Sequence, residues 1–214
     1  MKKFTLLLLL SCLSLGVFAQ RHFVKTDIFG NLTYRSDDGS YQATLKKNIF
    51  DDLVFSDNRR NEITYEKKYL LEQYPGILTN SNKQQHVFID LIRENRRSEN
   101  YTAKYRIDIF DKLIIEDNRG YKLEQGTDIF GSIQRNEQVN GVNTKLHKTL
   151  NGTWEFIEGK DKASLTNDIF NRRIYSDSFG NEIEFQAKSW QRLVNRYATE
   201  EDAFMSLVDQ FFYP

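Results

Sequence analysis

The amino-acid sequence predicts an all-β fold: an antiparallel β-hairpin repeat array of period 20, in an open, curved and twisted sheet, with a C-terminal amphipathic helix. The first observation is that the dipeptide Ile-Phe recurs five times, each time preceded by Asp or Asn and followed by Gly, Asp or Asn. Successive copies are separated by roughly 20 residues or a small multiple of that interval, which is typical of a repeat protein. The second observation is that the segment from Ile49 to Tyr65 aligns without a gap with Ile169 to Phe185.

Each Ile-Phe copy lies among residues that form turns. Asp27 can accept hydrogen bonds from backbone groups that follow it, and Gly30 can adopt the left-handed conformation. This pattern predicts a type I turn closed by a bulge between two antiparallel strands. The predicted turn residues are Asp27, Ile28, Phe29, Gly30, Ile49, Phe50, Asp108, Ile109, Phe110, Asp128, Ile129, Phe130, Gly131, Asp168, Ile169 and Phe170.

A second set of turn signals separates the strands at their other ends, within 36–39, 57–61, 116–120 and 176–181. Two turns in each repeat leave two strands of about six residues each. The segments between the turns alternate apolar and polar residues, as Glu62 to Tyr65 and Glu182 to Phe185 do, and this period of two indicates half-buried strands.

The Ile and Phe side chains stand at the centre of the predicted turns, where exposed apolar groups would gain nothing. We therefore expect each pair to be covered by the turn of the next repeat, which would contribute about 1.5 to 3 kcal/mol for each buried ring. In that arrangement the ten residues have a structural role.

Two segments depart from the pattern. The stretch 66–90 contains Tyr74-Pro75-Gly76 and a polar run, and we expect an irregular insertion there. In the segment 189–214, Thr199 begins a capping box, and apolar residues then recur at helical spacing. We expect a helical cap on the last strand. The alternative is that Phe211, Phe212 and Tyr213 bind a partner.

The motif Asp27-x-x-Gly30-Asn31-Leu32, followed by Asp37-Asp38-Gly39 on a pitch of about 20, resembles the tyrosine-aspartate (YD) repeat of bacterial shell-forming toxin proteins and teneurins. The resemblance covers most of 26–185 and implies a long antiparallel sheet that serves as a container or surface. Thr26, Lys47, Ile107, Thr127 and Asn167 stand where that family has Tyr. The resemblance therefore implies an open, curved and twisted sheet but no toxin module.

The segment 1–19 has the basic start, short apolar core and small-residue end of a secretory signal, similar to those of Bacteroidota envelope proteins. We expect cleavage after Ala19 and a repeat domain over 20–188; lipid attachment at Cys12 is the alternative. Cleavage would remove two of the 30 basic residues and none of the 30 acidic ones, leaving a net charge of about −2. A net charge this close to zero does not favour binding to nucleic acid. The mature chain would also hold no cysteine for disulfides.

Catalytic signatures are lacking in the sequence. His22, His86 and His147 have no metal-ligand spacing, and the acidic turn clusters supply too few carboxylates for calcium. We expect no enzyme activity, cofactor or metal. Arg59-Arg60, Arg96-Arg97 and Arg172-Arg173 lie near Tyr65, Tyr101 and Tyr175 and could bind a glycan or peptide, although most of these arginines are expected to be solvated surface.

The sequence thus predicts an exported envelope protein, in the periplasm or at the cell surface, that binds another protein through its β-repeat surface. Carbohydrate binding through strand aromatics is the alternative, and a hydrolase that uses carboxylates on the sheet face is a third hypothesis. No membrane span is expected in the mature chain.

Overall fold

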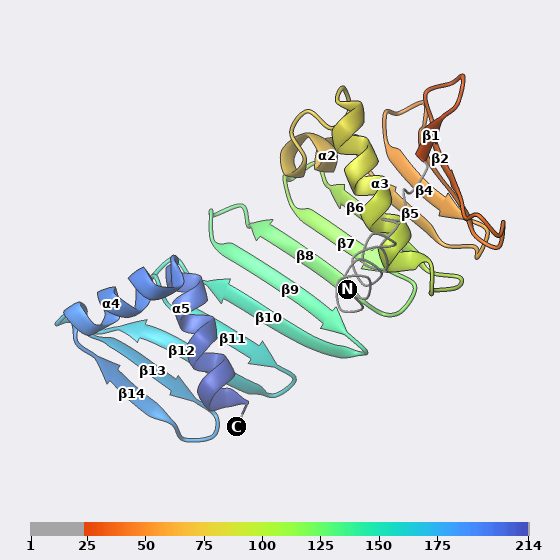
Figure 1. Ribbon diagram of the computed structural model, residues 1–214. Coiled ribbons are helices and arrows are strands. Elements are labelled where there is room, and N and C mark those ends of the chain that lie inside the picture. Colours follow the sequence, from red (N-terminus) through yellow and green to blue (C-terminus); the bar gives the residue numbers. More distant parts are fainter. Residues whose placement is uncertain (1–23, 214) are drawn as a thin grey trace, which may run out of the picture.

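The computed structural model describes residues 24–213 and contains one open sheet of 14 strands that follow each other in sequence order (Figure 1). Every neighbouring pair is antiparallel except β5 and β6, so the predicted open antiparallel sheet is confirmed. The expected signal peptide, Cys12 and His22 lie outside the described residues. The strands are β1 Val24–Thr26, β2 Leu32–Arg35, β3 Gln42–Lys47, β4 Leu53–Asp57, β5 Glu62–Tyr65, β6 Thr102–Ile107, β7 Leu113–Asp117, β8 Lys122–Thr127, β9 Ile133–Val139, β10 Val142–Lys148, β11 Trp154–Glu158, β12 Asp161–Asn167, β13 Arg173–Asp177 and β14 Glu182–Phe185.

The hairpin turns form where Asp or Asn precedes Ile-Phe. In the first turn, Asp27 Oδ1 accepts hydrogen bonds from the backbone N–H of Phe29 at 2.8 Å and of Asn31 at 2.9 Å. Asn48, Asp108, Asp128 and Asp168 accept the same pair of bonds in their own turns. The fourth residue of each turn has a positive φ, which explains why Gly, Asp or Asn stands there.

The segment between β5 and β6 is helical, so the expectation of an irregular insertion was wrong. It contains α2 (Lys67–Gln73) and α3 (Ser81–Asn95). Asn80 caps α3 by accepting from the N–H groups of Asn82 and Lys83. The buried residues Phe88, Leu91, Ile92 and Asn95 recur at helical spacing, a signal that the polar surroundings obscured.

This helical crossover preserves the side of the sheet on which the Ile-Phe turns lie. Because α2 and α3 carry the chain back to the starting end of β5, β6 runs parallel to β5 and ends on the same side. The next Ile-Phe turn, between β6 and β7, therefore lies on the same side of the sheet as the earlier ones. Tyr105 of β6 packs against Tyr65 of β5 and Tyr69 of α2, with ring centroids 4.6 and 5.5 Å apart.

The C-terminal segment forms α4 (Ala187–Tyr197), α5 (Glu200–Leu207) and a π-helical turn η2 (Val208–Phe212). Thr199 caps α5, since its hydroxyl accepts from the N–H of Asp202 at 3.0 Å. Glu200 joins this helix to three strands. Its carboxylate lies 2.6 Å from Lys148 Nζ, 2.7 Å from Arg173 Nη2 and 3.1 Å from Trp154 Nε1.

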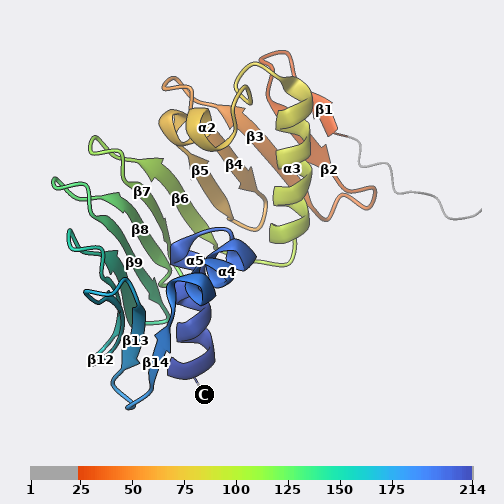
Figure 2. The same ribbon diagram turned by 90° about the vertical axis from the view of Figure 1, so that its left-hand side faces the viewer.

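Both helical segments cover the same face of the sheet (Figure 2). Each has its own hydrophobic core, the first around Phe55, Phe88 and Leu70 and the second around Tyr175, Phe204 and Val208. Among the described residues, no helix has the length and apolar character needed to cross a bilayer.

Candidate interaction surface

The five Ile-Phe pairs are exposed to solvent, so the expectation that neighbouring turns would bury them was wrong. The isoleucines are between 87% and 93% exposed and the phenylalanines between 68% and 82%. The physical reason is the direction of the turns. Each one projects from the end of its hairpin, past the region of strand pairing, so the next turn lies beside it and does not cover it.

A sixth apolar turn belongs to the same set and was missed from the sequence. Leu150, which is 73% exposed, occupies the position of Ile in the turn between β10 and β11. Thr149 and Gly152 close that turn with the backbone bonds seen in the Ile-Phe turns. Two features of the sequence could have identified this sixth turn: the glycine at position 152, and the location of the turn between two copies of the Ile-Phe dipeptide. We call the five Ile-Phe pairs together with Leu150 the Ile-Phe ridge.

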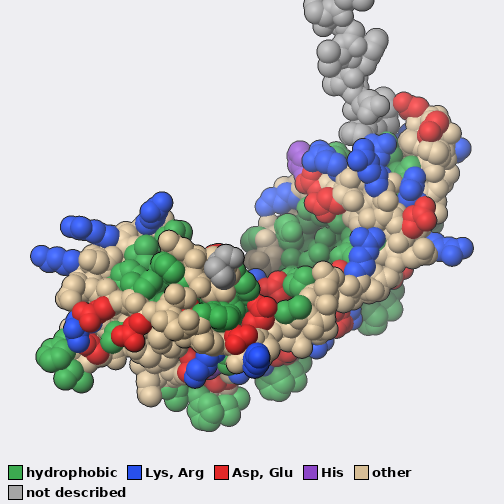
Figure 3. Space-filling view, turned by 90° about the horizontal axis from the view of Figure 1, so that it is seen from below, with side chains coloured by type: hydrophobic (Ala, Val, Ile, Leu, Met, Phe, Trp, Pro, Cys, Tyr) green, Lys and Arg blue, Asp and Glu red, His purple; other side chains and the backbone are tan. Residues whose placement is uncertain are grey.

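The ridge follows one side of the sheet. Its turns join β1 to β2, β3 to β4, β6 to β7, β8 to β9, β10 to β11 and β12 to β13, and the last four form a row along the left of Figure 2. Strands are about 4.8 Å apart, so the ridge is roughly 50 Å long. In Figure 3, hydrophobic side chains project at intervals along the lower rim of the molecule. A hollow separates the two ends of the molecule in this view.

The turns of the ridge are held by local hydrogen bonds. The carboxylate of Asp27 has a lowered pKa because the Asn31 side chain and two backbone N–H groups donate hydrogen bonds to it. Hydrogen bonds from the backbone of Lys112 and Phe110 lower the pKa of Asp108 in the same way. Each Ile-Phe pair thus follows an Asp or Asn whose side chain fixes the backbone of its turn, which reduces the entropy lost when a partner binds.

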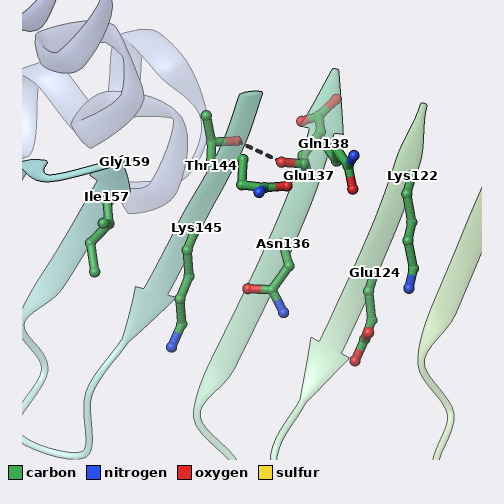
Figure 4. Close-up of a pocket in the computed structure, with 10 residues that line it drawn as sticks. Lys122, Glu124, Asn136, Glu137, Gln138, Thr144, Lys145, Ile157 and Gly159 are labelled. Carbon is green, nitrogen blue, oxygen red and sulfur yellow. Dashed lines mark hydrogen bonds between the residues drawn. The ribbon is translucent and has the colours of Figure 1, made fainter. Parts of the chain in front are cut away.

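The face of the sheet without helices has a different character. It contains a shallow pocket of about 470 Å³ in which Glu124, Asn136, Lys145 and Ile157 stand side by side on β8, β9, β10 and β11 (Figure 4). The pocket offers donors and acceptors to a polar ligand. Its acidic side chain on this face, Glu124, is already paired with Lys112.

The C-terminal aromatic residues pack within the chain. Phe212 is 5% exposed and contacts Phe156 and Phe179, with ring centroids 5.3 and 5.2 Å apart. Phe211 is half-buried against Tyr175, and the Tyr213 hydroxyl donates to Glu158. Phe212 is therefore unavailable to a partner in this conformation, whereas Tyr213 is 46% exposed.

Four of the arginine and tyrosine residues considered as a binding face support the fold, whereas Arg60, Arg96 and Arg97 are exposed. Tyr65 and Tyr175 are buried beneath the helices, and burial raises the pKa of both hydroxyls. Arg172 is bound to Asp168 and Glu184, and Arg173 to Glu200.

The histidines and acidic turns have local roles. His147 Nε2 lies 3.1 Å from Glu155, while His86 is on α3. The turn carboxylates bind their own backbone, and within 24–213 no three His, Cys, Asp or Glu side chains are grouped as a metal site would require.

Comparison of the chain with protein-family models, with curated proteins and with solved structures found no match.

Proposed function

We propose that this protein is a non-catalytic scaffold of the cell envelope that binds another protein along the Ile-Phe ridge. The observation that carries the proposal is that ten Ile and Phe side chains, each at least 68% exposed, lie on one side of a single sheet. Exposed apolar groups gathered in this way are unusual on a soluble surface and are typical of interaction sites.

The form of the ridge suits a protein partner better than a small ligand. Its turns are spaced along a line and do not enclose a cavity, so a partner has to be extended to contact several of them. Aromatic side chains that are rigidly held commonly dominate the energy of such interfaces. The carboxylates at the base of the turns give the ridge a polar rim, as is typical of protein interfaces.

Three points of this proposal rest on the sequence. The hairpins are units of a period-20 array, similar to YD repeats, with the C-terminal helices as its cap. The segment 1–19 is a cleaved export signal. The mature protein acts in the periplasm or at the cell surface. Together they describe an extended surface presented outside the cytoplasm.

Crosslinking in intact cells, followed by identification of the captured proteins, tests this proposal. The test variant replaces Ile109 and Phe110 of the ridge by Ser. The matched control replaces Val139 and Val142, which are 45% and 49% exposed on the opposite side of the sheet, by Ser.

We expect a defined envelope protein to be captured by the wild type and the control and to be lost with the ridge variant. Equal capture by all three proteins, with each variant folded by circular dichroism, would show that the ridge is not the binding surface.

A further inference from the structure

The last strand of the sheet, β14, corresponds to β5 in the first half of the chain. The bounds of β13 and β14 follow from those of β4 and β5 by adding 120 to each residue number, and the same offset relates the first residue of α4 to that of α2. The residues before the two helices have nearly the same backbone conformation, with φ −67° and ψ 148° at Glu66 and φ −63° and ψ 150° at Gln186.

An asparagine attaches the helices to the sheet in the same way in both places. Asn61 Nδ2 donates to Asp57 Oδ2 at 2.8 Å and to the carbonyl of Asn95, at the end of α3, at 3.1 Å. Asn181 Nδ2 donates to Asp177 Oδ2 at 2.9 Å and to the carbonyl of Phe211, within η2, at 3.1 Å. β5 and β14 are therefore joined by matching hydrogen bonds to the strand before them and to the helical segment after them.

At the outer edge the two strands differ. The edge of β5 is occupied by β6, which runs parallel to it. The N–H groups of Glu62 and Glu66 donate to the carbonyls of Tyr101 and Tyr105 at 2.8 and 2.9 Å, and Asn61 Oδ1 accepts from the N–H of Tyr101. No described residue pairs with the outer edge of β14.

The apolar side chains of β14 show the consequence of this open edge. Ile63 and Tyr65 of β5 are buried, being 3% and 9% exposed. Their counterparts Ile183 and Phe185 are only partly buried. A further strand on β14 would cover them, as β6 helps to cover β5.

The first strand, β1, resembles β6, which is the neighbour that β5 has and β14 does not. Both β1 and β6 lead directly into an Asp-Ile-Phe turn, which begins at Asp27 and at Asp108 respectively. Their registers with the following strand also agree, because Val24 pairs with Tyr34 as Tyr105 pairs with Ile115. Val24 is thus the counterpart of Tyr105, and within the described part of the chain the outer edge of β1 has no paired strand.

We propose that copies of this chain associate head to tail, with β1 of one copy pairing in parallel with the outer edge of β14 of the next. The β5–β6 junction gives the register, in which Phe185 of one copy lies beside Val24 of the other. The N–H of Gln186 then donates to the carbonyl of Val24, as that of Glu66 does to Tyr105. Lys25 lies diagonally from Glu184 on the helix-free face, where the Glu184 carboxylate also pairs with Arg172.

Such an interface uses different surfaces on the two copies, so it leaves a free edge at each end and allows further copies to add. The Ile-Phe turns of successive copies fall on the same side of the joined sheet. Association would therefore lengthen the ridge and leave it exposed, which makes this proposal independent of the partner-binding function.

Two proline variants block one edge each. In β5 the outward N–H groups recur at every second residue from Glu62 to Glu66, and Glu184 of β14 corresponds to the residue between them, Thr64. Glu184→Pro removes this outward donor, and Glu184→Ala is the matched control that removes the same carboxylate and retains the N–H. Val24→Pro removes one outward donor of β1, that of the residue placed beside Phe185.

Analytical ultracentrifugation over a wide concentration range is the measurement. We expect the average mass of the wild type and Glu184→Ala to rise with concentration to multiples of the monomer mass. Each proline variant alone should remain monomeric. An equimolar mixture of the two proline variants should form a one-to-one dimer and no larger species, because each still carries the edge that the other lacks.

A wild type that stays monomeric at all concentrations would overturn the proposal. So would an association that persists in Val24→Pro but is lost in Glu184→Pro, which would indicate symmetric pairing of two β14 edges. Association that both proline variants retain and that the Ile109 and Phe110 double variant loses would place self-association on the ridge and would likewise contradict it. Circular dichroism of each variant verifies that the sheet is intact.

Discussion

Replacing Phe110 by Ala should leave the stability of the protein almost unchanged. The Phe110 ring is 68% exposed, so only about a third of its surface is removed from water. Complete burial of a phenylalanine contributes about 1.5 to 3 kcal/mol, and a third of that is about 0.5 to 1 kcal/mol. The main-chain hydrogen bond from the Phe110 N–H to Asp108 does not depend on the side chain and should be retained.

Phe55→Ala provides the comparison within the same sheet. Phe55 is fully buried and packs against Phe88 of α3, with ring centroids 6.1 Å apart, so its removal should cost about 3 to 5 kcal/mol. Urea denaturation followed by circular dichroism measures the free energy of unfolding of both variants. If Phe110→Ala lost as much stability as Phe55→Ala, the ring would have to be buried, and the exposed ridge and the function proposed for it would both be refuted.

Three further perturbations test other parts of the structure. Glu200→Ala should lower the free energy of unfolding by about 2 kcal/mol in urea denaturation, because charged hydrogen bonds from Lys148 and Arg173 are lost together; an unchanged midpoint would contradict this role. Gly131→Ala should cost about 1 kcal/mol by thermal unfolding, since its φ of +81° is unfavourable for residues with a Cβ; a stabilised variant would contradict the turn geometry. The pKa of Asp27 lies below its ordinary value of 3.8, so its contribution to stability is fully present above that value and is lost as the pH falls through the lowered folded-state pKa; a carboxyl titration by NMR with a midpoint at or above 3.8 would show that the bonds from Asn31 are absent.

The hairpins could be predicted because the interactions that define them are local. Asp108 and the N–H groups that it binds lie within one short turn, and the alternation along β5 directly reflects which face of the strand is buried. The open antiparallel sheet follows from such hairpins. The two helices after β5 were missed because Asn80 and the buried residues of α3 stand in a polar sequence whose periodicity is weak.

The exposure of Ile109 and Phe110 could not be derived from their own turn. Whether an apolar side chain is covered depends on the direction in which its hairpin projects and on what lies next to it in space. Because the Ile-Phe dipeptide is repeated, its side chains were expected to be buried. The repetition shows only that these residues occupy equivalent positions in successive turns, and it does not show that they are buried. The turn residues could therefore be identified from the sequence, whereas their exposure could not.

By itself the sequence determined the turns, the alternating strands and their antiparallel pairing, because each depends on contacts between residues near each other in the chain. Only the tertiary structure decided that the Ile-Phe turns face solvent, and that the turns before and after the helical segment lie on the same side because β5 and β6 pair in parallel. The parallel pairing of β5 with β6 also shows which kind of strand is absent from the open edges of β14 and β1. It brings together two strands that are far apart in the chain.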